Sequence, residues 1–158
     1  MTAIPITIRV QAEPFDSEAE VASLTAGRTD VGAVVTFQGL CRSEGGSLAA
    51  LELEHYPGMA EAEIRRVAEA AAARWPVLGL AAIHRHGKIA PGAPIVLVVA
   101  TSSHRQAAFE AAAFLMDFLK TRAPFWKKEH HADGREGGWV DARETDDAAA
   151  ARWGGNDA

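Results

Sequence analysis

The chain has 158 residues, of which 48% are hydrophobic and 23% are charged, and its formal net charge is -5. This length suits one domain with its own core, and the acidic balance argues against a general nucleic-acid binder, whose affinity depends on neutralising many phosphates. The chain has one cysteine and no apolar run long enough to span a bilayer, and because its first residues lack a cationic segment followed by an apolar one, we expect no signal peptide. We therefore expect a cytoplasmic protein that forms one domain over residues 1–158, without a membrane or nucleic-acid partner.

Apolar periodicity in the first half of the chain predicts both strands and helices. Ile4, Ile6, Ile8 and Val10 alternate with other residues, which is the pattern of a half-buried strand. A later helix carries one apolar face and is ended by Trp75-Pro76. The expected elements are a strand at 4–10, a helix from about 17 that stops at 27, a strand at 32–38, a mobile loop at 40–47, a strand around 51–55 and a helix at 59–74.

The second half contains the most apolar strand and the most apolar helix. Residues 95–100 form a continuous, mainly β-branched run, typical of a central strand covered on both faces. The predicted helix at 104–119 is apolar nearly all round, so we expect it to be buried on more than one side. The other expected elements are a strand at 81–86, a turn at 91–92, a hairpin of strands at 125–130 and 139–142 with turn signals at 133–134 and 137–138, and a helical turn within 146–153. Without regular βαβ alternation, this order favours an α+β fold.

A cationic cluster follows the long helix, although the chain as a whole is acidic. Three of the four lysines lie within residues 120–128, with Phe125 and Trp126 between them. Cations beside aromatic rings suit a planar, anionic ligand. The alternative is a solvated helix end, where lysines complement the helix dipole and the aromatic residues belong to the core. This segment alone does not separate the two interpretations.

The chemistry of Lys120 and Lys127 is also open at this point. A lysine in a partly desolvated pocket beside other cations has a lowered pKa, so it can act as base, acid or nucleophile near neutral pH. Both lysines could equally serve as point charges on a phosphate. Residue type and spacing do not decide between these roles.

A second polar cluster, at residues 101–105, opens the long helix. His104 and Arg105 add side-chain donors where the helix N-terminus itself favours an anion, but a plain N-cap by Ser103 is the more frequent explanation of such a sequence. A helix of about 16 residues spans about 24 Å, which keeps His104 and Lys120 apart within one chain. The two clusters can share a pocket only if the segment after Pro124 folds back along the helix or a second copy completes the site.

Other polar residues carry weaker signals. Arg42 lies in the glycine-bearing loop, where it could swing onto a ligand or simply be solvated. The adjacent Cys41 is more typical of packing than of a nucleophile. His84 and His86 would share a face of a strand, but they lack supporting cysteines and the His-Glu-x-x-His spacing, so we expect no metal site.

Several long motifs follow one another along the chain, at 31–39 with Arg42 after them, and at 53–59, 83–87, 101–110, 116–129 and 139–143. Together, and in this order, they resemble the large, catalytic subunit of molybdopterin synthase. The resemblance extends over about residues 4–153. It implies an α/β-hammerhead-like single domain with a mainly antiparallel sheet packed by helices.

The resemblance also implies an activity and partners. Members of this family convert cyclic pyranopterin monophosphate to molybdopterin by installing two sulfurs, a sulfurtransferase step of molybdenum cofactor biosynthesis. The sulfur arrives as a thiocarboxylate on the C-terminal Gly-Gly of a small ubiquitin-like subunit. The large subunit forms a homodimer at the centre of a heterotetramer, and no cofactor is implied.

By the same resemblance, Lys120 and Lys127 would be the catalytic residues. Lys120 would lie near the thiocarboxylate as acid, base or transient acyl acceptor, and Lys127 would contact the pterin or its phosphate. An anion pocket and the channel for the small subunit's tail would be formed by further residues, with Arg143 supplied by either protomer of a dimer. The pocket residues are Arg42, His104, Arg105 and Arg143, and the channel or lysine-positioning residues are Phe37, Met116 and Glu129.

Two further hypotheses remain beside this one. The cationic cluster could belong to a non-catalytic, dimeric module that binds an anion or nucleotide. A metal-dependent hydrolase built on His84 and His86 is the third. Loss of turnover on replacing Lys120 separates the enzyme from the module, and bound metal after purification would indicate the hydrolase.

Overall fold

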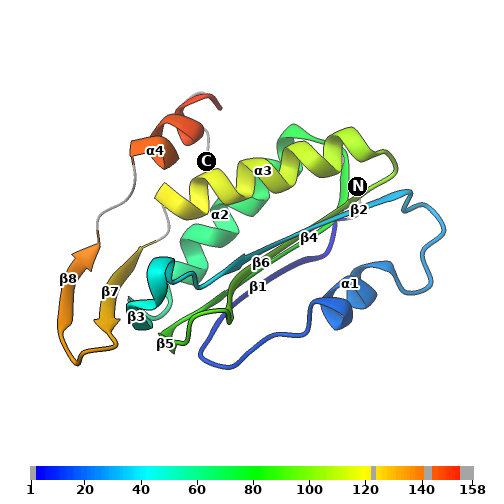
Figure 1. The fold of residues 1–158 in the computed structure, drawn as a ribbon. Coiled ribbons are helices and arrows are strands. Elements are labelled where there is room, and N and C mark those ends of the chain that lie inside the picture. Colours follow the sequence, from blue (N-terminus) through cyan, green and yellow to red (C-terminus); the bar gives the residue numbers. More distant parts are fainter. Residues whose placement is uncertain (1–2, 122–123, 141–143, 154–158) are drawn as a thin grey trace.

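The computed structural model describes residues 3–121, 124–140 and 144–153, which form two four-stranded sheets and the helices that pack on them (Figure 1). A short 3₁₀ turn, Glu44–Gly46, interrupts the loop after the second strand. The elements in chain order are β1 (Ile6–Gln11), α1 (Ser17–Thr25), β2 (Ala33–Leu40), β3 (Leu48–His55), α2 (Met59–Arg74), β4 (Val77–Arg85), β5 (Gly87–Ile89), β6 (Pro94–Ser102), α3 (Arg105–Thr121), β7 (Phe125–His131), β8 (Glu136–Val140) and α4 (Glu144–Ala151).

The first sheet has the strand order β1-β4-β6-β2, in which only β1 and β4 run parallel. Helices α2 and α3 cover one face of this sheet, and α1 lies on the other (Figure 1). Strand β6 sends Val96 and Val98 into the core beneath α2 and α3, whereas Leu97 and Val99 pack toward α1. The prediction that residues 95–100 form a central strand covered on both faces is confirmed.

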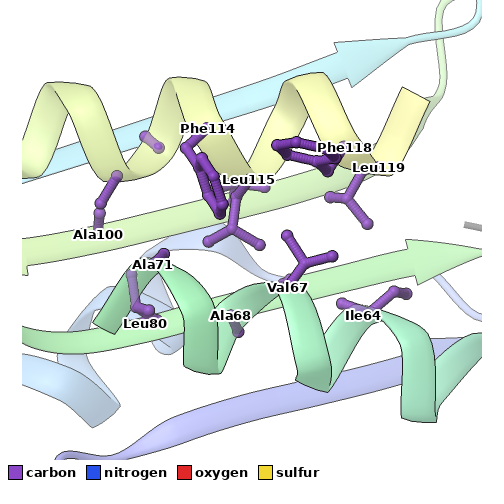
Figure 2. Packing of buried hydrophobic residues seen from close by; sticks show 14 of the residues in the cluster. Ile64, Val67, Ala68, Ala71, Leu80, Ala100, Phe114, Leu115, Phe118 and Leu119 are labelled. Carbon is purple, nitrogen blue, oxygen red and sulfur yellow. The ribbon is translucent and has the colours of Figure 1, made fainter. Parts of the chain in front are cut away.

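The main core lies between α2, α3 and the first sheet (Figure 2). Phe114, Leu115 and Phe118 of α3 face the small residues Ala68 and Ala71 of α2, and all five are buried. Burying a leucine or phenylalanine side chain contributes about 1.5–3 kcal/mol, so these residues hold α3 firmly on the sheet. The direction of α3 is therefore fixed by packing along most of its length, which fixes where its two ends lie.

The second sheet has the order β5-β3-β7-β8 and is antiparallel throughout. Its hairpin, β7 and β8, turns at Asp133-Gly134, where Gly134 has a φ of 88°. The prediction of a hairpin is confirmed, but Gly137-Gly138 lies within β8 and not in a turn. The antiparallel sheet expected from the sequence is thus two sheets, one of them mixed.

The boundaries of the predicted elements differ mainly at strand ends. Helix α2 has the predicted bounds, whereas β4 begins at Val77, four residues before the expected start. Leu40 belongs to β2 and not to the loop, and β5 was not predicted. The expected strand end at Ala142 lies outside the described residues. Within the described ranges, no helix combines the length and apolarity that crossing a membrane requires.

Candidate active site

An open cleft lies where the second sheet meets the end of β2 and the last turn of α3. Its volume is about 650 Å³, and three cations, Arg42, Lys120 and Lys127, line it beside one carboxylate, Glu129. Phe37 and Leu40 of β2 lie at the same cleft and are 42% and 55% exposed. Three positive charges against one negative charge favour an anionic ligand in this cleft.

Alternate side chains of strand β7 point toward the cleft. Because neighbouring residues of a strand point to opposite faces, Lys127 and Glu129 share one face and Lys128 lies on the other. Lys127 is paired across the sheet with Leu53, whereas Lys128 is paired with Glu52. Two adjacent lysines of similar chemistry are therefore separated by the pleat of the strand, and only Lys127 lines the cleft.

A smaller pocket of about 80 Å³ lies next to the cleft and shares both of its lysines. Its walls are mostly apolar, with Met116 and Leu119 from α3 and Phe125 from β7. The residues common to cleft and pocket are Gly39, Leu40, Ile95, Lys120 and Lys127. Lys120 and Lys127 therefore stand at the junction between a wide, open space and a narrow, apolar one.

His84, near the end of β4, supplies the pocket with a polar wall. Its ring is stacked on Phe125, with 3.8 Å between centroids and 15° between planes. Its Nδ1 lies 2.8 Å from the carbonyl oxygen of Arg85, which can only accept a hydrogen bond, so Nδ1 carries the proton. Burial lowers the pKa of His84 to about 4, assisted by the charges of Lys127 and Lys120.

The other end of α3 is different. His104 and Arg105 lie on a shallow surface depression together with Phe109, which is 60% exposed, and Glu110. A helix of 17 residues is about 25 Å long, so this depression is separated from Lys120 by nearly the whole helix. A single chain does not bring His104 or Arg105 into the lysine cleft.

The structure of one chain thus gathers six of the nine residues expected at the site. Lys120, Lys127, Arg42, Phe37 and Glu129 line the cleft, and Met116 lines the adjoining pocket. Arg143 lies outside the described residues. Strand β7 pairs with β3 and brings Lys127 to the same cleft as Lys120, but this cleft does not include His104, so the segment after Pro124 does not join the two clusters.

Two polar residues singled out in the sequence have structural roles. The Ser103 hydroxyl donates to the carbonyl oxygen of Asp30, 3.2 Å away, and so ties the start of α3 to the loop before β2. The Cys41 side chain is buried, with its Sγ 3.6 Å from the Ile89 carbonyl oxygen. Burial raises the pKa of the Cys41 thiol, which disfavours a nucleophilic thiolate.

The histidines considered as metal ligands do not converge. His84 stacks on Phe125, while the ring of His86 lies 4.5 Å from that of His55. Burial, and next the neighbouring His86, lower the pKa of His55. In the part of the chain that the structure describes, no group of three His, Cys, Asp or Glu side chains is arranged to hold a metal ion.

His84 and Phe125 are site residues that the reasoning from residues alone did not assign to the pocket. The sequence placed His84 on a strand and Phe125 beside the lysines, but nothing in either pattern indicates that the two rings stack. The stacking requires β7 and β4 to meet across the two sheets, a contact between residues 41 positions apart. Only the tertiary structure supplies that pairing.

An α+β protein that holds two lysines between an open cleft and an apolar pocket suits an enzyme acting on an anionic substrate. Comparison with known families identifies which one. Residues 10–122 match the family model of the MoaE protein. The chain belongs to this family, that of the molybdopterin synthase catalytic subunits. The predicted family, and with it a sulfurtransferase of molybdenum cofactor biosynthesis, is confirmed.

Individual relatives agree with this assignment. The molybdopterin synthase catalytic subunit of Mesorhizobium japonicum is 71% identical over 147 residues, which cover 93% of this chain and 92% of that protein. A solved structure, the molybdopterin biosynthesis MoaE protein from Burkholderia ambifaria, is 51% identical with a TM-score of 0.81, over 94% of this chain and 98% of that one. The α+β fold expected from the sequence is thereby confirmed.

A more distant solved structure shares the fold alone. It is a protein–protein complex of subunits 1 and 2 of molybdopterin-converting factor from Helicobacter pylori, 21% identical with a TM-score of 0.67. The match covers 88% of this chain and 90% of that one.

Proposed function

We propose that this chain converts cyclic pyranopterin monophosphate to molybdopterin with sulfur from a thiocarboxylated small ubiquitin-like subunit, and that it does so in the cytoplasm. The observation that carries the proposal is the meeting of Lys120 and Lys127 at the junction of cleft and pocket. These two lysines come from α3 and β7, and both substrates of the reaction are anions. Two cations at one junction can hold a phosphate and a thiocarboxylate side by side.

The chemistry assigns different tasks to the two lysines. For each sulfur delivered, a C–S bond forms on the pterin side chain and a C–O bond at the same carbon breaks, its oxygen staying on the phosphate or leaving as water. The acyl C–S bond breaks, and the acyl group passes finally to water as a carboxylate. Lys120 serves the acyl group, as acid, base or transient acceptor, while Lys127 holds the pterin or its phosphate. Two thiocarboxylates are consumed per molybdopterin, and the scheme needs no cofactor.

The cleft is the proposed binding site for the small subunit's tail. A Gly-Gly terminus is narrow enough to lie along the exposed Phe37 and Leu40 and to reach the lysines at the junction. Met116 and Glu129, which line the adjoining surfaces, would position the tail or the lysines. The Helicobacter pylori structure, whose fold this chain shares, is a complex of two subunits of molybdopterin-converting factor, and the proposal takes a partner of that kind for this chain.

A second copy of the chain would complete the anion pocket. His104 and Arg105 lie too far from Lys120 along α3 to serve the same cleft, so the proposal takes them, with Arg143, from the partner in a homodimer. Such a dimer with one small subunit at each end is a heterotetramer. Each cleft would then have lysines from one protomer and additional cations from the other.

The test is a single-turnover reaction of this chain with a thiocarboxylated small subunit and cyclic pyranopterin monophosphate, followed by mass spectrometry. Two added sulfurs that depend on both proteins support the synthase, and Lys120→Ala should abolish them while leaving the small subunit bound. If the wild-type chain binds the pterin but adds no sulfur with a competent partner, the anion-binding module is the better description. Retained turnover in Lys120→Ala would overturn the catalytic role of Lys120 but leave the proposed synthase function in place.

A further inference from the structure

The apolar pocket behind the lysines contains one polar side chain that the proposed chemistry leaves unused. His84 is only 8% exposed, and what exposure it has is toward the pocket that it lines with Lys120 and Lys127. It comes from β4 of the first sheet, whereas the lysines come from α3 and β7. A buried imidazole at the meeting of three elements needs a physical reason, because burying a polar ring costs free energy unless its nitrogens have partners.

Two contacts fix the ring and its proton. The Nδ1–H group donates to the Arg85 carbonyl oxygen at 2.8 Å, and the ring lies against Phe125 at 3.8 Å. Phe125 precedes Lys127 by two residues on the same face of β7. The strand that carries Lys127 therefore also supplies the ring that packs against the His84 imidazole.

The charged and titratable groups around His84 are Lys127 from β7, Lys120 from α3 and His55 from β3. Together with burial, all three lower the pKa of His84, to about 4, so the ring is neutral throughout the physiological pH range. A neutral imidazole with its proton on Nδ1 keeps a lone pair on Nε2. That lone pair is the one acceptor His84 can offer to the lysine pocket.

We propose that His84 is a positioning residue, which accepts a hydrogen bond at Nε2 from the Lys127 ammonium group and so orients that group toward the substrate. This inference rests on the proposed function of the lysines. A carboxylate at the same place would neutralise the charge that an anionic substrate requires. A neutral imidazole directs the ammonium group without cancelling its charge, because it contributes a dipole and not a negative charge.

The competing explanation is a histidine that serves packing only, through Nδ1 and its stacked ring. Amide variants separate the two nitrogens. In His84→Asn the amide nitrogen takes the place of Nδ1, so the bond to Arg85 is kept and the acceptor at Nε2 is lost. In His84→Gln the amide oxygen can reach the place of Nε2, so the acceptor is kept. His84→Phe keeps the stacked shape and loses both nitrogens.

In single-turnover sulfur transfer, we expect rates reduced about ten- to a hundredfold in His84→Asn and His84→Phe, the loss typical of a hydrogen bond to a charged group. His84→Gln should stay within about threefold of wild type, and binding of the small subunit should be unchanged in all three. Normal rates in His84→Asn with a loss in His84→Gln would assign the role to Nδ1 and overturn the proposal. Normal rates in all three variants would overturn it equally. Thermal unfolding of each variant verifies that it is folded.

A measurement without turnover keeps this inference separate from the proposed function. Acetic anhydride at a fixed, neutral pH labels lysines, and mass spectrometry compares Lys127 with the exposed Lys88 in the same sample. Loss of the acceptor should raise the relative labelling of Lys127 about threefold or more in His84→Asn and leave it near the wild-type value in His84→Gln. Equal labelling in both variants overturns the role of His84, whether or not sulfur transfer is observed.

Discussion

The two ends of α3 carry similar residue types but are built very differently. At the end of the helix, Lys120 meets β2 and β7, with Lys127, Arg42 and the buried His84 close by. At its start, His104 and Arg105 lie on an open surface with Phe109. Both ends are cationic, but only at the Lys120 end do residues of several elements line a cleft and a pocket.

The difference shows that local charge does not make a site by itself. Walls formed by residues distant in sequence lower the local dielectric, and charges then act more strongly on a ligand than they do in water. The Lys120 end has such walls within one chain. The His104 end lacks them, and under the proposed function it acquires them only against a second copy.

The largest expected effect contrasts two adjacent lysines of β7. Lys127 lines the cleft, whereas Lys128 points to the other face of the sheet. We expect Lys127→Ala to reduce single-turnover sulfur transfer by about 10²–10³-fold, the range for loss of a group that holds substrate charge at the reacting centre. Lys128→Ala removes the same charge from the same strand and should change the rate by less than about threefold.

The same two variants, Lys127→Ala and Lys128→Ala, also test whether the rate of sulfur transfer depends on the total positive charge of the cluster or on the position of each lysine. If both variants lose activity to a similar extent, the cluster acts through its summed charge, and the contrast between the two faces of β7 has no catalytic meaning. Raising the ionic strength should then reduce the wild-type rate strongly as well, because a summed surface charge is screened by salt.

Mixed dimers test whether the two ends of α3 belong to one site. Chains with Lys120→Ala and chains with Arg105→Ala should each be weakly active or inactive. Mixed after subunit exchange, they should recover about one quarter of wild-type activity, because about half of the dimers are mixed and each of these has one intact site. Activity of the reconstituted mixture is the measurement.

The matched control for this experiment mixes Lys120→Ala with Lys127→Ala. These two residues line the same cleft of one chain, so every dimer contains only damaged sites and no activity should return. Recovery in the control, or its absence in the first mixture, would contradict a site shared between protomers.

The buried histidine should make the Lys120 end sensitive to acid. The folded-state pKa of His84, about 4, lies below its ordinary value of 6.5, so the unfolded chain takes up the proton first. Stability from this group is therefore complete above about pH 6.5 and is lost as pH falls toward 4, by up to about 3 kcal/mol. Urea unfolding at pH 7 and pH 4.5 should show a smaller acid loss in His84→Phe than in wild type.

His104→Phe provides the comparison at the open end of the helix. Because His104 is exposed, replacing it should leave the acid loss of the wild-type chain in place. An equal acid loss in all three proteins would mean that His84 is not the buried neutral group described here.

The sequence predicted the helices and strands of this fold better than it predicted how the two sheets are arranged against each other. The pattern of apolar residues located α2 and the core strand β6. A helix with one buried face has apolar residues at helical spacing, and a strand buried on both faces is a continuous apolar run. The sequence missed β5, whose three residues are too short for any pattern, and misplaced Gly137-Gly138, which lie within β8. Close packing explains the second case, since a Cβ at Gly137 would meet the Glu129 side chain at 3.1 Å.

For the site, the cationic cluster near Lys120 and Lys127 was readable from the sequence, and its neighbours were not. Charge clustering in an acidic chain marked the lysines, and family resemblance added Phe37, Met116 and Glu129. The stacking of His84 on Phe125 depends on β4 and β7 meeting in space, and no local pattern encodes that. Equally, helix length predicted correctly that His104 lies apart from Lys120.

The smallest expected effect is a difference between two glycines, Gly32 just before β2 and Gly39 near the end of β2, which lie near opposite ends of α3. A Cβ at Gly32 would overlap the carbonyl oxygen of Ser103, and the Gly32 N–H group donates to Ser102 at 3.0 Å, so neither backbone can move away. We expect Gly32→Ala to destabilise the fold by about 1–3 kcal/mol in urea unfolding. A Cβ at Gly39 would meet a methyl group of Val96 at 2.8 Å, a side chain that can shift toward the lysine pocket.

For Gly39→Ala, the strain of that shift is offset by about 0.5–1 kcal/mol, because alanine loses less backbone freedom in a strand than glycine does. The net change in the free energy of unfolding should therefore stay within about 1 kcal/mol. The start of α3 is held by backbone atoms and the cleft end by side chains, so only the former should resist one added methyl group. A larger loss at Gly39 than at Gly32 would reverse this contrast, and the cleft end would then be the rigid one.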